Sequence, residues 1–239
     1  MLAPAKLTLS LRVTGVRDGG YHLLDAEMVT IDLADELLID GRGDGLEVVD
    51  QTATGLPVAA GPDNLVTRAL TLAGRRAYVM LVKHIPAGAG LGGGSADAAA
   101  VLRWTRVTDP HIAVTLGADV PFCLLGGRAR VSGVGDLLDP LPFEPRTFTL
   151  LTPPFGCSTP AVYRAWDELG GPAADGPNDL EAAALVVEPR LAEWRDHLGD
   201  ATSQTPVLAG SGSTWFVHGE FPDVDGAVVA RTVPAGWDG

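Results

Sequence analysis

The densest group of residues suited to chemistry is the segment 83–103, KHIPAGAGLGGGSADAAAVLR, in which five glycines precede an alanine-rich stretch. Each glycine loses more backbone freedom on folding than any other residue, so such a run is costly unless the backbone must approach something closely. Glycines let several N–H groups converge on one anion, and a following helix adds the positive end of its dipole. We predict a phosphate-binding loop, with Ser95 as the helix N-cap and its hydroxyl available to the phosphate.

Three alternative roles for this loop fit less well. Gly88, Gly90 and Gly93 form a GxGxxG pattern, but no second strand ending in an acidic residue follows about 20 residues later, as a dinucleotide site requires. A Walker loop needs a lysine after the last glycine, and Gly94 is followed directly by Ser95. A purely structural turn from strand to helix needs fewer glycines.

The residues alone leave open the roles of two further features. Lys83 and His84 lie just before the loop, and we expect such charges at a strand end to be solvated. A second glycine turn at residues 210–212 closes either on a ligand or on an ordinary hairpin.

Composition limits the class of protein and of partner. The 239 residues include 17 basic and 30 acidic side chains, a formal charge of −13, which argues against nucleic acid and against an anionic membrane as partners. Local backbone dipoles still permit a small phosphorylated ligand. The two cysteines make no disulfide framework, and no apolar run approaches the ~20 residues of a membrane helix. We therefore predict a cytoplasmic protein.

Hydrophobic periodicity predicts mainly strands in the first part of the chain. Alternation of leucine with polar residues gives a strand over 6–13, and the other strands are expected up to Ile31 and over 35–40, 46–50 and 77–85. Asn64 is expected to cap a helix that ends at Leu72.

The middle and last parts predict a mixture of helices and strands. The segment 109–127 predicts a short helix, a tight turn and then a buried strand, and the segments 129–142 and 147–154 predict strands that continue the same sheet. Beyond a composition shift near residue 153 we expect these elements: helices over 161–169 and 189–198, two strands around a glycine turn within 205–219, and a helix and a strand within 224–234. The pattern predicts an α+β fold divided near residue 150.

Several segments resemble motifs of the GHMP kinase superfamily in the order expected for it. These segments are APAKLTLSLRVTGVRDGGYHLLD (3–25), PAGAGLGGGSADAAA (86–100) and VLAGSGSTWFV (207–217). Within the superfamily, LGADVPFCLLGG, STPAVY and NDLE are most similar to the kinases that phosphorylate a cytidine-bearing methylerythritol in non-mevalonate isoprenoid biosynthesis. The likeness runs from one end of the chain to the other.

The resemblance implies a two-domain GHMP kinase fold. Its N-terminal domain, residues 1–150, would resemble domain 2 of ribosomal protein S5, and its C-terminal domain, residues 151–239, would be ferredoxin-like. ATP would be the phosphoryl donor, with Mg²⁺ expected, and a small cytidine-bearing molecule would be the acceptor. The resemblance leaves the metal ligands and the oligomeric state unknown.

The resemblance also implies roles for individual residues. Asp119 and Lys6 match the catalytic positions, where a carboxylate would orient the substrate hydroxyl and an ammonium would offset charge on the transferring phosphoryl group. The implied ATP-binding residues are Pro86, Gly88, Gly90, Leu91, Gly92, Gly93, Gly94 and Ser95. The implied substrate-binding residues are Thr8, Tyr21, His22, Thr159, Tyr163, Gly210 and Ser211, of which the two tyrosines would stack on the cytosine ring and His22 would hydrogen-bond it.

The chain departs from the family pattern at two positions of the site. Thr8 stands where the family has asparagine, and Ala96 replaces the second serine of the glycine loop. Two alternatives therefore accompany the leading hypothesis: another small-molecule kinase of the superfamily, and a catalytically weak ligand-binding relative. Intact Lys6 and Asp119 favour an active enzyme.

Overall fold

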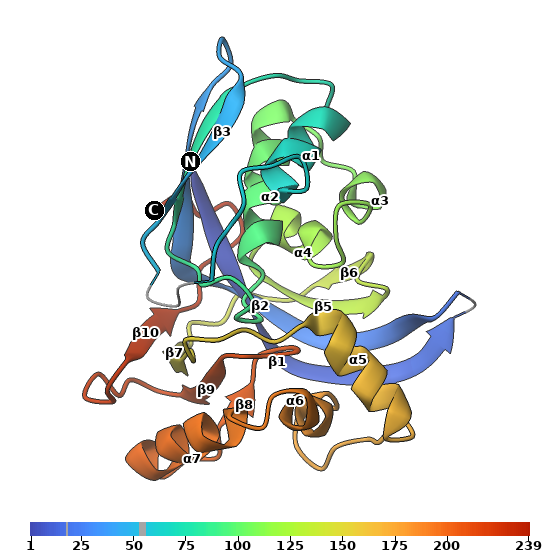
Figure 1. Cartoon of the computed structure of the whole chain (residues 1–239), viewed down its shortest axis with the longest axis vertical. Coiled ribbons are helices and arrows are strands. Elements are labelled where there is room, and N and C mark those ends of the chain that lie inside the picture. The colour runs from blue at the N-terminus through green and yellow to red at the C-terminus, as the bar shows by residue number, and fades with distance from the viewer. Residues whose placement is uncertain (18, 53–55) are drawn as a thin grey trace.

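The computed structural model describes residues 1–17, 19–52 and 56–239, which form two β-sheets, each with its own helices (Figure 1). The first sheet has the strand order β3-β4-β2-β5-β6, with β1 paired to β2. Its strands are β1 (Leu2–Arg17), β2 (Tyr21–Asp40), β3 (Gly45–Asp50), β4 (Tyr78–Lys83), β5 (Arg128–Gly133) and β6 (Leu137–Pro140).

Strands β1 and β2 form one long antiparallel hairpin that runs beneath the helices of the first sheet (Figure 1). The strand predicted over 6–13 is confirmed as part of β1. The separate strand predicted over 35–40 is wrong, because β2 continues without interruption from Tyr21 to Asp40. The acidic residues of 32–36 look like a break in the sequence, but Asp35 is fully buried and paired with Lys83.

Four helices lie on one face of the first sheet (Figure 1): α1 (Leu65–Leu72), α2 (Gly93–Thr105), α3 (Pro110–Ala113) and α4 (Val120–Leu125). The predicted cap of α1 is confirmed, since Asn64 Oδ1 accepts a hydrogen bond of 2.9 Å from the Val66 N–H. The predicted cap of α2 is wrong. Gly92 is the N-cap, with φ +68°, and its carbonyl accepts the first helical hydrogen bond from the Ala96 N–H. Glycine reaches this left-handed conformation at little cost, so the helix begins before Ser95.

The buried strand expected after the tight turn at residues 117–121 is also wrong, because α4 occupies that segment. Pro121 lies in the first turn of α4, where a missing N–H costs no helical hydrogen bond. The apolar run that follows is short, and a short buried run does not distinguish strand from helix.

The second sheet has the antiparallel order β10-β7-β9-β8, with helices packed beside it (Figure 1). Its elements are β7 (Thr147–Leu151), α5 (Thr159–Glu168), α6 (Glu181–Val187), α7 (Leu191–Thr202), β8 (Val207–Leu208), β9 (Trp215–His218) and β10 (Ala227–Arg231). This order, in which the first strand lies between the third and the fourth, agrees with the ferredoxin-like expectation.

Three expectations for this part differ from the structure. Strand β7 belongs to the second sheet and does not continue the first. The segment 224–234, all of which is described, contains only strand β10 and no helix, and helix α6 was not predicted. The second sheet thus begins before residue 150, and the division into domains 1–150 and 151–239 stays a prediction.

Three buried apolar clusters hold the fold together: one in each half, and one between the two sheets. The cluster between the sheets contains Leu7 of β1, Phe148 of β7 and Phe216 of β9, together with Ala89 and Leu91 of the glycine loop. Burying one leucine side chain stabilises a fold by about 1.5–3 kcal/mol, so Leu91 anchors the loop between the sheets. Among the described helices, none has the length and apolar character needed to cross a membrane.

Replacing Phe122 tests the importance of the first cluster. Phe122 of α4 is fully buried there, and Phe122→Ala is expected to lower the free energy of unfolding by about 3–5 kcal/mol, because it removes apolar contacts and leaves a cavity. Urea denaturation measures this loss. The control Val228→Ala, at a position with 49% exposure, should change stability by less than about 0.5 kcal/mol. Equal effects of both substitutions would contradict the assignment of Phe122 to the core.

Candidate active site

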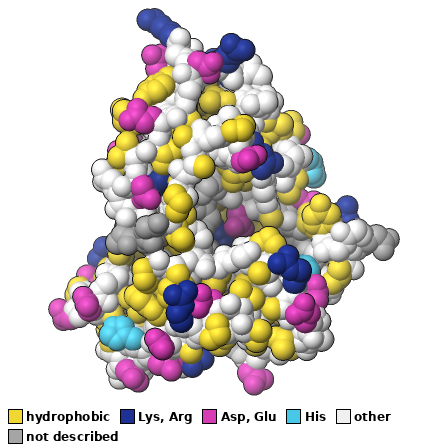
Figure 2. Space-filling view, viewed as in Figure 1, with side chains coloured by type: hydrophobic (Ala, Val, Ile, Leu, Met, Phe, Trp, Pro, Cys, Tyr) yellow, Lys and Arg dark blue, Asp and Glu magenta, His cyan; other side chains and the backbone are white. Residues whose placement is uncertain are grey.

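A cleft of about 650 Å³ lies between the two halves of the molecule, and Figure 2 shows the hollow with acidic and basic side chains at its base. Small-molecule sites in proteins have volumes of this order. Its walls come from β1, the glycine loop, the first residues of α1 and α2, the two residues just before α4, helix α5 and the glycine turn before β9.

The glycine loop is packed so closely that side chains have no room at two positions. At Gly90, with φ +78°, an added Cβ would lie 2.2 Å from the Ala209 carbonyl oxygen. At Gly92 it would lie 2.8 Å from Cγ of Lys6. The Lys6 N–H also donates a 3.0 Å hydrogen bond to the Leu91 carbonyl. The loop therefore rests directly on the lysine and on the second glycine turn.

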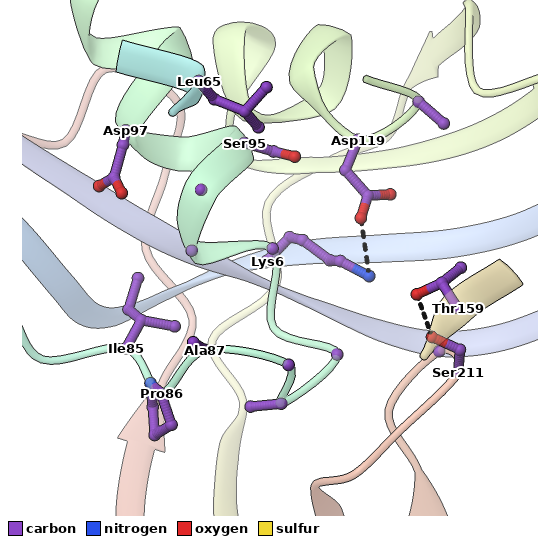
Figure 3. Close-up of a pocket in the computed structure, with 18 of the residues that line it drawn as sticks. Lys6, Leu65, Ile85, Pro86, Ala87, Ser95, Asp97, Asp119, Thr159 and Ser211 are labelled. Carbon is purple, nitrogen blue, oxygen red and sulfur yellow. Dashed lines mark hydrogen bonds and ion pairs between the residues drawn. The ribbon is translucent and has the colours of Figure 1, made fainter. Parts of the chain in front are cut away.

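The first turn of α2 opens into the cleft. Gly93, Gly94 and Ser95 are its first three residues, and all three line the cavity. The N–H groups of a first turn have no partner within the helix, so they are available to an anion. Ser95 contributes its hydroxyl from this turn and not from the cap (Figure 3). The N-cap lies at Gly92, three residues earlier than predicted, and anion binding by the loop stays a prediction.

Lys6 and Asp119 meet in the middle of the cleft (Figure 3). Lys6 Nζ lies 3.3 Å from Asp119 Oδ2 and donates a 3.0 Å hydrogen bond to Thr8 Oγ1. Lys6 is 5% exposed, whereas the Asp119 side chain is 31% exposed. Asp119 immediately precedes α4, but its side chain makes no capping hydrogen bond to that described helix. Its carboxylate is thereby left to face the lysine and the cavity.

The second glycine turn forms the opposite wall and is held from α5 and from the NDLE segment. Thr159 Oγ1 and Ser211 Oγ are joined by a 2.8 Å hydrogen bond (Figure 3). The Asn178 side-chain amide donates to the carbonyls of Leu208 and Gly210 at 2.8 and 2.7 Å. The sequence marked Asn178 only as part of a motif, and its position beneath the turn gives it a structural role.

Of the residues expected to bind the cytosine ring, one lines the cavity and two do not. Tyr163 lines the cavity, and burial, with a further contribution from the charge of Asp119, raises the pKa of its phenol, which stays neutral at physiological pH. His22 does not line the cavity. Its ring lies 4.6 Å from that of Tyr163, and its Nε2 hydrogen-bonds Asp167 Oδ1 at 2.8 Å. Tyr21 is 64% exposed at the end of the hairpin.

Most of the residues singled out in the sequence line this one cavity. The set comprises Lys6, Thr8, Pro86, Gly88, Gly90, Gly92, Gly93, Gly94, Ser95, Asp119, Thr159, Tyr163, Gly210 and Ser211. Leu91 does not: its side chain is buried in the cluster between the sheets. The roles given to these residues remain predictions.

Sequence analysis did not identify one part of the cavity lining, and it wrongly predicted that Lys83 is solvated. Residues 57–59, Leu65 and Ile85 add a largely apolar part to the cavity lining, to which the polar side chains of Asp63 and Asn64 also belong. Lys83, expected to be solvated, is 2% exposed. The alternation of β4 carried the signal, since Lys83 falls on the same face as the buried Val79 and Leu81. Asp97 likewise lies on the buried face of α2.

Among the described residues, no group of three or more His, Cys, Asp or Glu side chains could hold a metal ion.

Comparison with known proteins agrees with the fold. Residues 64–127, which include the glycine loop and Asp119, match the family described as GHMP kinases N terminal domain. The class defined by the two-sheet fold and the glycine-lined cleft is the GHMP kinases.

Relatives that align over nearly the whole chain identify its branch within the GHMP kinases. The chain is 43% identical to the 4-diphosphocytidyl-2-C-methyl-D-erythritol kinase of Paracoccus denitrificans, over 98% of this chain and 91% of that protein. It is 39% identical to the enzyme of the same name from Ruegeria pomeroyi, over 98% and 95%. A crystal structure of 4-(cytidine 5'-diphospho)-2C-methyl-D-erythritol kinase superposes with a TM-score of 0.78 at 34% identity, over 97% of this chain and 98% of that one. The chain belongs to the 4-diphosphocytidyl-2-C-methyl-D-erythritol kinase family.

Gly90 provides a direct test of the loop geometry. Gly90→Ala is expected to lower the thermal unfolding temperature and to open the contact between the loop and the second glycine turn, because the new Cβ would overlap the Ala209 carbonyl. The matched control is Gly74→Ala. Gly74 also has positive φ, at +62°, but its Cβ would meet no described atom within 4 Å, so only backbone strain of about 1–2 kcal/mol is expected. Calorimetry of both variants measures the difference, and equal destabilisation would contradict the close packing.

Proposed function

We propose that this protein transfers the γ-phosphoryl group of ATP to a hydroxyl of 4-diphosphocytidyl-2-C-methyl-D-erythritol. The single observation that carries the mechanism is the Lys6–Asp119 pair, which lies between the glycine loop and the pocket walled by Thr159 and Tyr163. The names of the full-length relatives support the choice of substrate.

The glycine loop and the start of α2 would bind the phosphates of ATP. Backbone N–H groups that converge from Gly93, Gly94 and Ser95 suit the charge of a polyphosphate. The largely apolar part of the lining formed by residues 57–59 and Leu65 suits the adenine ring. When bound to ATP, Mg²⁺ offsets charge on the phosphate oxygens. The requirement for Mg²⁺ and the cytoplasmic location stay predictions.

Asp119 would orient the acceptor hydroxyl and take its proton as the oxygen attacks the γ-phosphorus. Its carboxylate is oriented by Lys6 Nζ at 3.3 Å and is partly open to the cavity. The stem of Lys6 packs against Gly92 of the glycine loop and its ammonium lies beside Gly210 of the second glycine turn, so the ammonium would offset negative charge that builds up on the transferring group between them.

Tyr163, Thr159 and Ser211 would hold the cytidine-bearing substrate on the other side of the pair. A neutral tyrosine ring offers a stacking surface to a pyrimidine, and the linked hydroxyls of Thr159 and Ser211 offer both donors and acceptors. His22 supports Tyr163 from behind, through ring contact, without reaching the cavity lining.

Neither departure from the family pattern removes a group that this mechanism needs. Thr8 Oγ1 accepts a hydrogen bond from Lys6 Nζ and so helps to orient the lysine. Ala96 is 1% exposed and packs in the core of the first half, outside the cavity lining. These contacts favour an active kinase over a weak ligand-binding relative.

A second candidate is another small-molecule kinase of the GHMP class. The exposure of Tyr21, at 64%, and its absence from the cavity lining favour this alternative, since one of the two expected stacking rings lies away from the cleft. Comparing turnover of the cytidine-bearing substrate with turnover of homoserine and mevalonate distinguishes the two candidates.

Asp119→Asn is expected to lower kcat by about 10²–10⁴-fold, because the amide cannot accept the hydroxyl proton. Coupled measurement of ADP release, with and without 4-diphosphocytidyl-2-C-methyl-D-erythritol, gives kcat and KM. The control Glu220→Gln removes a carboxylate whose partner is the exposed Arg231, and it should leave kcat unchanged. Substrate-dependent turnover that survives in Asp119→Asn would exclude the role proposed for this carboxylate.

Tyr163→Ala is expected to raise the KM for the cytidine-bearing substrate by roughly 10-fold, a loss typical of one base–aromatic stack, while KM for ATP changes little. Tyr78→Phe serves as the control, since Tyr78 lies outside the cleft and its hydroxyl bonds Glu47 on the surface. An equal rise in both KM values would indicate a general disturbance of the cleft and contradict a specific contact with the base.

A further inference from the structure

Lys83 is buried between two carboxylates directly beneath the glycine loop, and the proposed mechanism does not use it. Its Nζ donates to Asp97 Oδ2 at 2.7 Å and also to Asp35 Oδ2. Lys83 is 2% exposed, Asp97 2% and Asp35 0%. The three side chains come from the end of β4, from α2 and from β2.

This cluster ties down both ends of the glycine loop. At the start of the loop, Asp35 Oδ1 accepts hydrogen bonds from the His84 and Ile85 N–H groups, at 2.6 and 2.8 Å. At its end, Asp97 lies in the helix that the loop enters. A single ammonium therefore links the strand before the loop to the helix after it.

Gly93 is the point at which the helix start rests on this cluster. A Cβ added there would lie 3.0 Å from Ile85 Cγ2 and 3.2 Å from Lys83 Nζ. The missing side chain lets Gly93, the first residue of α2, approach the ammonium of Lys83. Lys83 and Asp97 also line the cavity itself.

Burying these three charged side chains is energetically unfavourable if their role is only structural. Removing three charges from water costs several kcal/mol for each ion, and apolar residues of similar size would often be at least as stabilising. Two carboxylates and one ammonium leave one negative charge in excess. Asp97 Oδ1 is buried without a hydrogen-bond partner among the described residues. This unfavourable burial of charge occurs directly beneath the glycine loop, where the polyphosphate would bind.

We propose that Lys83, held by Asp35 and Asp97, is a positioning residue for the nucleotide: it fixes both ends of the glycine loop for the phosphates, and protonation of Asp97 favours their binding. The inference rests on the proposed function in one respect, that the anion on the loop belongs to a nucleotide.

The charges around Asp97 explain why its protonation would matter. Burial and the charge of Asp35 together raise the pKa of Asp97 to about 7, against the opposing charge of Lys83. Burial alone would lower the pKa of Lys83, but the two carboxylates raise it, so the lysine stays charged. Ionised Asp97 leaves the cluster with a net charge of −1, which repels phosphate, and protonated Asp97 leaves it neutral.

In the described parts of the chain, strand β2 packs against α2 and carries Asp35 of the cluster and Glu36, whose carboxylate lies 3.5 Å from His84 Nε2. From α4, burial raises the pKa of the Cys123 thiol to about 12, so it stays neutral. Helix α1 presents the apolar side chains of Val66, Ala69 and Leu70. Strand β1 carries Lys6, whose ammonium is paired with Asp119. Nucleotide affinity should therefore be highest below pH 7 and fall as the pH rises through 7.

The first experiment compares wild-type protein with Asp97→Asn, which has nearly the same shape. Calorimetry measures the dissociation constant of a non-hydrolysable ATP analogue with Mg²⁺ at pH 6.0 and 8.5. ATP itself titrates in this range, so the decisive quantity is the difference between the two proteins. Wild-type affinity should fall by up to about 10-fold per pH unit above the pKa, and the amide should abolish this additional fall. Identical pH profiles of the two proteins would overturn the proton-linked part of the proposal.

The second experiment compares Lys83→Met with Arg103→Met. Arg103 lies near the other end of α2 and donates to the carbonyls of Cys123 and Leu2, outside the main cleft, so its loss should cost stability without altering the loop. Lys83→Met should raise KM for ATP by roughly 10- to 100-fold, with a smaller change in kcat, as expected when a binding contact is lost. KM for ATP in Arg103→Met should match the wild type.

The outcomes separate this inference from the proposed function. If both methionine variants lose stability but keep the KM of the wild type for ATP, Lys83 is only structural and the proposal fails. If Lys83→Met does not fold, the pH dependence of nucleotide affinity in wild type and Asp97→Asn decides whether the cluster acts on nucleotide binding. Wild-type protein that binds no nucleotide would contradict the proposed function and this role together, whereas normal binding by wild type and all variants would contradict the role of Lys83 alone.

Discussion

The close backbone contact between the glycine loop and the second half of the molecule is the constraint on which the cleft depends. Gly90 approaches the carbonyls of the second glycine turn so closely that only a residue without a side chain fits. The carbonyls of Gly88 and Ala89 accept hydrogen bonds from the N–H groups of Cys157 and Thr214, at 3.1 Å each. The loop is therefore also part of the interface between the sheets, and any ligand that it binds lies at that interface.

The same constraint explains why Lys6 and Asp119 meet in the cleft. Lys6 supplies a backbone N–H to the loop, an aliphatic stem against Gly92 and an ammonium to Asp119. Packing of the loop between the sheets thus fixes the lysine, and the lysine fixes the carboxylate. Beneath the loop, the buried cluster of Lys83 and its two carboxylates fixes the strand before it and the helix after it. Rigid support on both sides is what a phosphoryl-transfer site requires, because catalysis there is chiefly positioning and charge stabilisation.

Sequence patterns predicted secondary structure correctly where it depends on interactions between residues close in the sequence. The alternation of 6–13 predicted β1, and Asn64 predicted the start of α1, because side-chain periodicity and capping depend on neighbouring residues. Ser95 failed as a cap because Gly92 could adopt a left-handed conformation that starts the helix earlier. The segment after Pro121 failed because a short apolar run fits either a strand or a helix, and its packing against α2 decided between them.

The sequence by itself determined the glycine loop, the motif order and hence the class of enzyme, since these depend on residue types at fixed spacing. Only the tertiary structure decided which residues share the cleft. It brought Lys6 and Asp119 within 3.3 Å across more than a hundred residues, and it left Tyr21 exposed. The alternation of β4 already places Lys83 on the buried face, but only the tertiary structure brought Asp35 and Asp97 from distant elements to pair with it. Such pairings depend on how the sheets and helices pack, and no local pattern contains that information.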